Sequence, residues 1–105
     1  MGIRTFQLPS FEEWKSKNYD YTGKLGVFYC SVERFCYYSD GACFKLSVAN
    51  FKIPSNINVN QIISISYMHV PSEPDAMSKL EAWYNGLQEA LNKKWFEYIE
   101  HTYLN

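Results

Sequence analysis

The C-terminal third of the chain carries apolar residues at the spacing of an α-helix. Across residues 76–103 they recur every three or four positions, which places them on one helical face. Glu89 and Lys93, four positions apart, form a favourable helical pair of opposite charge. The pattern predicts a long amphipathic helix, whose apolar stripe consists of Leu80, Trp83, Tyr84, Leu87, Ala90, Leu91, Trp95, Tyr98, Ile99 and Thr102.

Asn85 and Gly86 interrupt this helix without shifting its apolar stripe. Glycine costs about 1 kcal/mol relative to alanine inside a helix, and Asn-Gly is also a common stop signal. Because the stripe keeps its phase, we expect one helix, kinked or straight. Residues 76–103 would span about 42 Å if straight, which exceeds the diameter of roughly 35 Å expected for a domain of this size. We therefore expect the helix either to bend at Gly86 or to dock its end on another molecule.

The middle of the chain predicts antiparallel strands. Residues 24–32 are rich in β-branched and aromatic side chains and are apolar on both faces, which is typical of a central strand. Residues 34–38 and 42–48 flank Ser39-Asp40-Gly41, in which Asp-Gly favours a type I′ hairpin turn. In the second arm, apolar residues alternate with polar ones, as in a half-buried strand. Residues 61–70 form the last predicted strand.

The segments between these strands have the composition of loops. Residues 18–23 and 54–60 are rich in glycine, asparagine, serine or proline, and we expect both to be irregular. The alternation of apolar residues also slips by one position at Ala49 and Asn50. That slip predicts a β-bulge or the end of a strand.

A short helix is predicted near the N-terminus. Ser10-Phe11-Glu12-Glu13 is a capping box, in which the serine hydroxyl accepts a hydrogen bond from the backbone N–H of Glu13. Phe11 and Trp14 stand three positions apart and share one helical face.

These elements together predict a single α+β domain over residues 1–105. It comprises a short N-terminal helix, an antiparallel meander of three to five strands, and a long C-terminal helix packed on one face of the sheet. No crossover helix separates the strands, so parallel β-α-β units are not expected. With 105 residues, of which 47% are hydrophobic, the chain is large enough for one core.

Composition excludes several classes of function. A hydrophobic content of 47% with a net charge of -1 argues against disorder and against bulk electrostatic binding to nucleic acid. The sequence has no apolar run of membrane-spanning length and no signal-peptide pattern, so we expect no membrane association and a cytoplasmic location. The three cysteines, an odd number, fit free thiols in a reducing compartment.

The residues with reactive side chains form no recognisable catalytic or metal-binding motif. Cys30, Cys36 and Cys43 with His69 could supply four zinc ligands, but zinc sites usually contain a close cysteine pair. A cysteine nucleophile would need His69 or His101 as its base. Glu12, Glu13, Glu73 and Asp75 precede or begin helices, where the helix dipole accounts for them. We predict no catalytic residues, no cofactor and no metal.

Aromatic residues are unusually abundant, at 18% of the chain, with nine Tyr, seven Phe and three Trp. Ordinary core packing explains many of them, but seven tyrosines, at 19, 21, 37, 38, 84, 98 and 103, are too many to be interior together. Exposed tyrosine and tryptophan are typical of protein interfaces. Phe96 also lies off the main helical stripe. We therefore predict a partner-binding surface formed by the hairpin residues Tyr37, Tyr38 and Asp40 and the helical residues Phe96, Glu97 and Glu100.

The functional hypothesis is a small non-enzymatic protein that sequesters or inhibits a macromolecular partner, as immunity proteins and phage anti-defence inhibitors do. Lysine far exceeds arginine, and Asn, Ile and Tyr are common, a bias frequent in phage and mobile-element genes. The alternative is a structural domain that forms a homodimer through its overhanging helix. A small Cys/His enzyme or metal protein is the third hypothesis.

Overall fold

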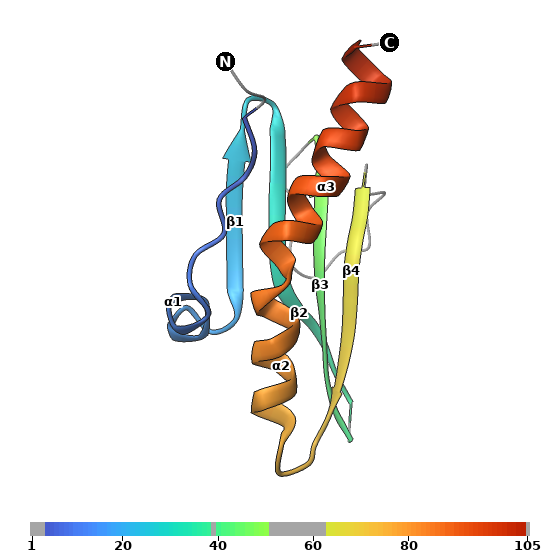
Figure 1. The fold of residues 1–105 in the computed structure, drawn as a ribbon. Coiled ribbons are helices and arrows are strands. Elements are labelled where there is room, and N and C mark those ends of the chain that lie inside the picture. Colours follow the sequence, from blue (N-terminus) through green and yellow to red (C-terminus); the bar gives the residue numbers. More distant parts are fainter. Residues whose placement is uncertain (1–3, 39, 51–62, 105) are drawn as a thin grey trace.

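The computed structural model describes residues 4–38, 40–50 and 63–104, with the side chains of residues 35–38, 64, 103 and 104 excepted (Figure 1). The predicted loop at 54–60 lies outside the described residues. In chain order the elements are α1 (Phe11–Ser16), β1 (Asp20–Leu25), β2 (Phe28–Tyr38), β3 (Gly41–Ala49), β4 (Ile63–Pro71), α2 (Ala76–Asn85), α3 (Leu87–Ile99) and the π-helical turn η1 (Glu100–Leu104).

The four strands form one antiparallel sheet in the order β1-β2-β3-β4. The helices α2 and α3 run along one face of this sheet, and α1 lies at the side of β1 (Figure 1). This arrangement confirms the predicted α+β meander with a C-terminal helix on one face. Buried residues of β2 and β3 face the helices, at Cys30, Val32, Phe44, Leu46 and Val48.

The first hairpin was not predicted from the sequence. The expected loop at 18–23 and strand at 24–32 are wrong, because β1 already begins at Asp20 and the chain reverses after Leu25. Leu25 pairs with Phe28, which leaves Gly26 and Val27 as the two turn residues. Gly26 has a φ of 64°, and glycine at the first central position is typical of the II′ hairpin turn. Val27, whose side chain is 66% exposed, is a turn residue and not a core residue.

The second hairpin, between β2 and β3, is confirmed, with its turn one residue earlier than predicted. The last pair is Tyr38 with Gly41, so Gly41 belongs to β3 and not to the centre of the turn. A Cβ atom on Gly41 would collide with the carbonyl of Val70 on β4. Glycine is therefore required there because β4 passes so close. The register of the β2–β3 pair shifts between Arg34 and Cys36, and that of the β3–β4 pair shifts between Leu46 and Ser47. The strand β3 ends at Ala49.

A serine cap precedes the N-terminal helix α1, and two residues with left-handed backbone follow it. The Ser10 hydroxyl accepts a hydrogen bond of 3.1 Å from the Glu13 backbone N–H, as the capping box predicts. After the helix, Asn18 and Tyr19 adopt left-handed φ values of 61° and 59°. This pair turns the chain into β1, and Tyr19 donates its backbone N–H to the carbonyl of Trp14 at 3.0 Å.

The C-terminal helix is bent at Gly86, one of the two outcomes that its length predicted (Figure 1). Gly86 has φ of −90° and ψ of −7°, between the end of α2 and the start of α3. The apolar stripe continues across the bend, since Leu80, Tyr84, Leu87, Leu91 and Trp95 are all buried. The bend lets the helix follow the sheet while it keeps that stripe inward.

Trp14 is at the centre of the core. Its side chain is fully buried, its indole N–H donates to the Val32 carbonyl at 3.0 Å, and its ring stacks on Tyr84 at 4.5 Å. Tyr19 and Phe44 complete its aromatic surroundings. A second aromatic group joins Phe6, Phe28, Trp95 and Tyr98 beside α3.

Of the seven tyrosines judged too many to be interior together, the four whose side chains the structure describes take part in this core. Tyr84 is buried, and Tyr19, Tyr21 and Tyr98 are half-buried against the core cluster. Among the described rings, the exposed ones are Tyr67 and Phe96, at 58% and 37%. Packing therefore accounts for most of the aromatic excess in the part of the chain that the structure describes.

Candidate functional site

The two halves of the predicted binding surface lie at opposite ends of the molecule. Asp40 is exposed in the turn between β2 and β3, at the end of the sheet where α2 begins. Phe96 and Glu97 are exposed near the far end of α3, and Glu100 is exposed at the start of η1 (Figure 1). Tyr37 and Tyr38 are the last residues of β2, and their side chains lie outside the described ones. The molecule measures 46 Å along its longest axis. The structure does not bring these residues into one continuous patch.

Of the cysteines and histidines considered as a metal or nucleophile site, Cys30 lies apart from Cys43 and His69. Cys30 belongs to the core under the helices, and burial raises the pKa of its thiol to about 12, so it stays protonated at neutral pH. Cys43 pairs with His69 across β3 and β4 on the other face of the sheet.

On that second face, the Cys43 sulfur lies 3.1 Å from the Tyr67 hydroxyl, and His69 Nε2 lies 3.7 Å from the Asp40 carboxylate. Cys36 is opposite Cys43 in the register, and its side chain lies outside the described ones. His101 is exposed in η1. Within the described ranges, no three His, Cys, Asp or Glu residues are placed to hold a metal ion.

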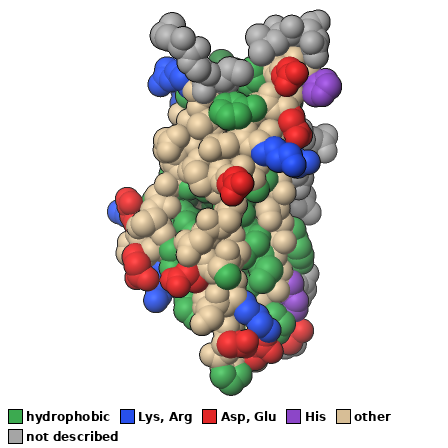
Figure 2. Space-filling view, in the orientation of Figure 1, with side chains coloured by type: hydrophobic (Ala, Val, Ile, Leu, Met, Phe, Trp, Pro, Cys, Tyr) green, Lys and Arg blue, Asp and Glu red, His purple; other side chains and the backbone are tan. Residues whose placement is uncertain are grey.

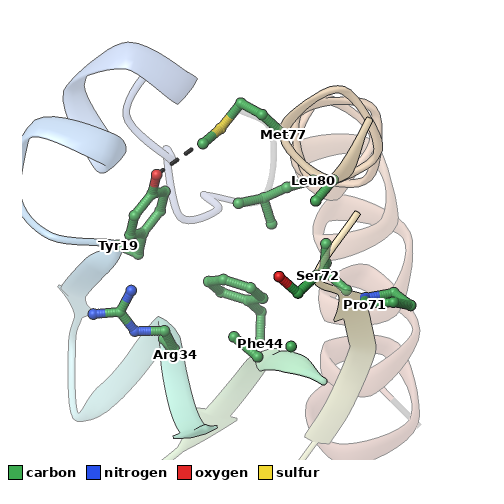
Figure 3. Close-up of a pocket in the computed structure, with 11 residues that line it drawn as sticks. Tyr19, Arg34, Phe44, Pro71, Ser72, Met77 and Leu80 are labelled. Carbon is green, nitrogen blue, oxygen red and sulfur yellow. Dashed lines mark hydrogen bonds between the residues drawn. The ribbon is translucent and has the colours of Figure 1, made fainter. Parts of the chain in front are cut away.

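A cavity of about 340 Å³ lies at the hairpin end of the molecule, between the sheet and the first turns of α2 (Figure 3). Elements distant in the sequence form its walls: the residue before β1, the strands β2, β3 and β4, and the start of α2. Its lining residues are Tyr19, Arg34, Gly41, Ala42, Phe44, Val70, Pro71, Ser72, Ala76, Met77 and Leu80. Most of these are apolar, so the cavity suits an apolar group.

Local conformation places each wall of this cavity. Phe44 forms the floor from β3, while Met77 and Leu80, three positions apart on α2, face it from above (Figure 3). The left-handed backbone of Tyr19 directs its ring across from α2, and its hydroxyl lies 3.9 Å from the Met77 sulfur. A bulky residue with positive φ is uncommon. Packing of Tyr19 against Trp14 and Phe44 holds it there.

Arg34 alone carries charge among the described residues that line the cavity. Its guanidinium lies over the Tyr19 ring at 5.4 Å and donates to the side-chain oxygen of Asn18 at 3.3 Å. The backbone N–H of Arg34 donates to the Tyr19 carbonyl at 3.3 Å. These contacts fix a planar cation beside an apolar floor. A guanidinium in this setting suits a carboxylate, which it can bind through two parallel hydrogen bonds.

The rim at the start of α2 is acidic. Lys79 forms ion pairs with Glu73 and Asp75, and both carboxylates raise the pKa of the lysine above its usual value. The Asp75 side chain thus pairs with Lys79 and does not cap α2. Figure 2 shows hydrophobic side chains gathered over the lower half of one face, between α1 and α2, with charged side chains around them. An acidic ligand group would therefore be repelled at this rim and attracted on the Arg34 side.

Sequence reasoning did not find this site. One signal was present: Arg34 continues the spacing of Cys30 and Val32, so a charged side chain stands at a position of the strand that faces the helices. Tyr19 gave no signal, because it was assigned to a loop. Phe44 is one of the alternating apolar residues of the strand predicted at 42–48, and it is buried.

In the part of the chain that the structure describes, no helix is both long and apolar enough to cross a membrane. Searches of protein-family models, curated proteins and solved structures found no match to this chain.

Proposed function

We propose that this chain is a non-enzymatic binding protein that sequesters or inhibits another protein, whose apolar side chain enters the cavity beside Arg34. The observation that supports this function is the open, mostly apolar cavity of about 340 Å³ with a single guanidinium at its edge. Its volume falls at the lower end of ligand sites, roughly 300–1,000 Å³, which suits one or two side chains. The partner presents an Asp, a Glu or a terminal carboxylate next to that apolar residue.

The cavity supplies the two interactions that dominate small interfaces. Burial of one large apolar side chain contributes about 1.5–3 kcal/mol, and a hydrogen bond to a charged group contributes about 1.5–3 kcal/mol. Such anchors usually lie at the centre of an interface, surrounded by weaker contacts. Met77 is 46% exposed, and Asp40 is exposed and accepts a hydrogen bond from the backbone N–H of the lining residue Ser72. The surrounding contacts would form at these residues.

The molecule has enough surface for such an interface. A standard interface buries about 800 Å² on each partner, which is about an eighth of the 6656 Å² of this chain. The aromatic excess no longer supports the proposal, because most of the described rings are in the core. The support comes from the cavity and its guanidinium.

A displayed library of random peptides tests the proposal without knowledge of the natural partner. We expect selected peptides to carry a large apolar residue next to Asp, Glu or a C-terminal carboxylate. Arg34→Gln and Met77→Asp should each weaken binding of the selected peptides at least tenfold, since they remove the cation or place a charge in the apolar wall.

Lys24→Gln is the matched control for loss of one cation. Lys24 is exposed, and its ammonium lies over the Tyr29 ring on β2, so this variant should bind like the unaltered chain. Circular dichroism verifies that each variant is folded. Peptides without an acidic group, or binding unchanged by Arg34→Gln, would refute the proposal. Light scattering on the unaltered chain tests the homodimer alternative.

A further inference from the structure

Residues 4–9 run alongside β1 toward α1 as a segment without helix or strand, and side chains of the C-terminal helix bind its backbone (Figure 1). The Trp95 indole N–H donates to the Arg4 carbonyl at 2.8 Å, and the Tyr84 hydroxyl donates to the Pro9 carbonyl at 2.7 Å. From the other side, the Tyr21 hydroxyl on β1 donates to the Gln7 carbonyl at 3.0 Å. Side chains of α2, α3 and β1 thus line a groove around this segment, which we call the strap.

Gln88 contacts the strap as a neighbouring β-strand would. Its amide Nε2 donates to the Phe6 carbonyl at 2.8 Å, and its Oε1 accepts from the Leu8 backbone N–H at 2.8 Å. These two backbone groups flank residue 7 and point to the same side, as in a sheet ladder. Nε2 also approaches Asn92 Oδ1 at 3.0 Å, which orients the amide. Because Gln88 contacts backbone atoms, it recognises an extended peptide and not one particular side chain.

The side chains of Phe6 and Leu8 supply the specificity. They alternate with the exposed Gln7, as residues of an extended segment do. Phe6 is 3% exposed and packs edge-on against Trp95, with ring centroids 5.2 Å apart, while Leu8 packs against the core cluster.

The strap does not fill its groove. A second cavity, of about 330 Å³, lies beside it and is lined by Gln7, Leu8, Pro9, Ser10, Phe11, Tyr84, Asn85 and Gln88. Loosely packed segments open at lower cost than the rest of a structure.

We propose that this groove is a binding site for an extended peptide, and that the strap of a second copy of the chain can occupy it in trans. The second copy presents the same residues, so each contact made within one molecule can form between two. A short tether keeps the chain's own strap at an effective concentration of about millimolar, which favours the closed monomer. Exchange therefore occurs when copies are concentrated or when the strap is weakened.

The experiment uses a synthetic peptide with residues 4–10 and the full chain carrying Phe6→Ala. This variant keeps the groove but loses the aromatic anchor of its own strap. We expect the peptide to raise the melting temperature of the variant with increasing concentration, because it binds the folded state alone. Adding Gln88→Ala to the variant should weaken peptide binding at least tenfold, since two hydrogen bonds to the peptide backbone are lost.

Gln7→Ala is the matched control, because its side chain is exposed and its carbonyl remains. At micromolar concentration the peptide should leave the melting temperatures of this variant and of the unaltered chain almost unchanged. A peptide that itself carries Phe6→Ala should not raise the melting temperature of the Phe6→Ala chain. The proposal would be overturned if the peptide did not raise the melting temperature of the Phe6→Ala chain. It would also be overturned if the rise were the same after Gln88→Ala had been added.

A measurement on the unaltered chain covers the case in which Phe6→Ala does not fold. At millimolar peptide, comparable with the effective concentration of the strap, the Leu8 amide hydrogen should exchange with solvent faster, because its Gln88 acceptor is taken. An unchanged exchange rate would overturn the proposal. The groove is separate from the cavity beside Arg34, so Arg34→Gln should not change the rise in melting temperature that the peptide causes. The proposed function and the proposed peptide site can therefore fail independently.

Discussion

Glu33 is an acidic residue in the middle of the sheet, and only 6% of it is exposed. In the strand register it stands between Asp20 on β1 and Lys45 on β3. Burial raises the pKa of this carboxyl above its usual 4.5, the neighbouring Asp20 charge raises it further, and Lys45 lowers it. The ionised form of Glu33 is therefore disfavoured in the folded state relative to the unfolded chain.

Glu33→Gln should raise the melting temperature at pH 7. The folded protein keeps the Glu33 proton to a higher pH than the unfolded chain does, so the free energy of unfolding falls as the pH rises past 4.5. Glutamine has nearly the same shape and does not ionise, so it avoids this loss. The difference in melting temperature between the variant and the wild type should shrink as the pH falls below 4.5, where Glu33 is protonated in both the folded and the unfolded wild type.

Thermal unfolding followed by circular dichroism from pH 3.5 to pH 7 measures this difference. A variant that melts below the wild type at pH 7 would mean that the attraction of Lys45 outweighs the cost of burying the charge. Asp20→Asn, which removes a smaller cause of the same shift at an exposed position, should give a weaker effect of the same sign.

At the scale of elements, Gly86 follows an asparagine and Gly41 follows an aspartate, yet substitution by alanine should have opposite effects on stability at these two positions. A Cβ at Gly86 meets its nearest neighbour, the Trp83 carbonyl, at 3.6 Å, an ordinary contact in a helical conformation. Gly86→Ala should therefore stabilise the protein by about 0.4–1 kcal/mol, because it restricts the unfolded chain. Gly41→Ala should destabilise it by about 1–3 kcal/mol, because its Cβ would strike the backbone of β4.

Urea denaturation gives both free energies of unfolding on one scale. If Gly86→Ala proves destabilising, the bend requires a conformation that alanine resists. If Gly41→Ala proves neutral, β4 can move away from the hairpin.

How far each element could be predicted depends on how local its signal is. The α2–α3 stripe was predictable from Leu80 to Ile99, because helical periodicity depends on near neighbours. Thr102, which was also assigned to the stripe, is exposed in η1. The β1–β2 hairpin was missed because Val27, an exposed turn residue, looks like part of a continuous apolar strand. The cavity and the strap could not be predicted, since both depend on contacts between residues far apart in the sequence.

At the scale of the whole molecule, one core joins every layer. Trp14 on α1 contacts Tyr84 on α2, Phe44 on β3 and the backbone of β2 at Val32. The radius of gyration is 14.2 Å, close to the value of about 13 Å typical of a compact domain of 100 residues. The molecule should therefore unfold as one unit.

Trp14→Ala should lower the free energy of unfolding by about 3–5 kcal/mol, since a fully buried indole and its hydrogen bond to Val32 are lost. Denaturation of the unaltered chain should show one transition, with coincident midpoints by tryptophan fluorescence and far-ultraviolet circular dichroism. Separate midpoints would mean that α1 and the strap form an independent unit.

The strap can be covered only after α2 and α3 have been synthesised. Phe6 and Leu8 leave the ribosome well before the side chains that shelter them, from Tyr84 to Trp95, have been made. At roughly 5–20 residues per second, translation from Phe6 to Trp95 takes about 4 to 18 s. During that time the nascent chain carries two uncovered apolar side chains, so chaperones and other nascent copies can reach them before its own helix does.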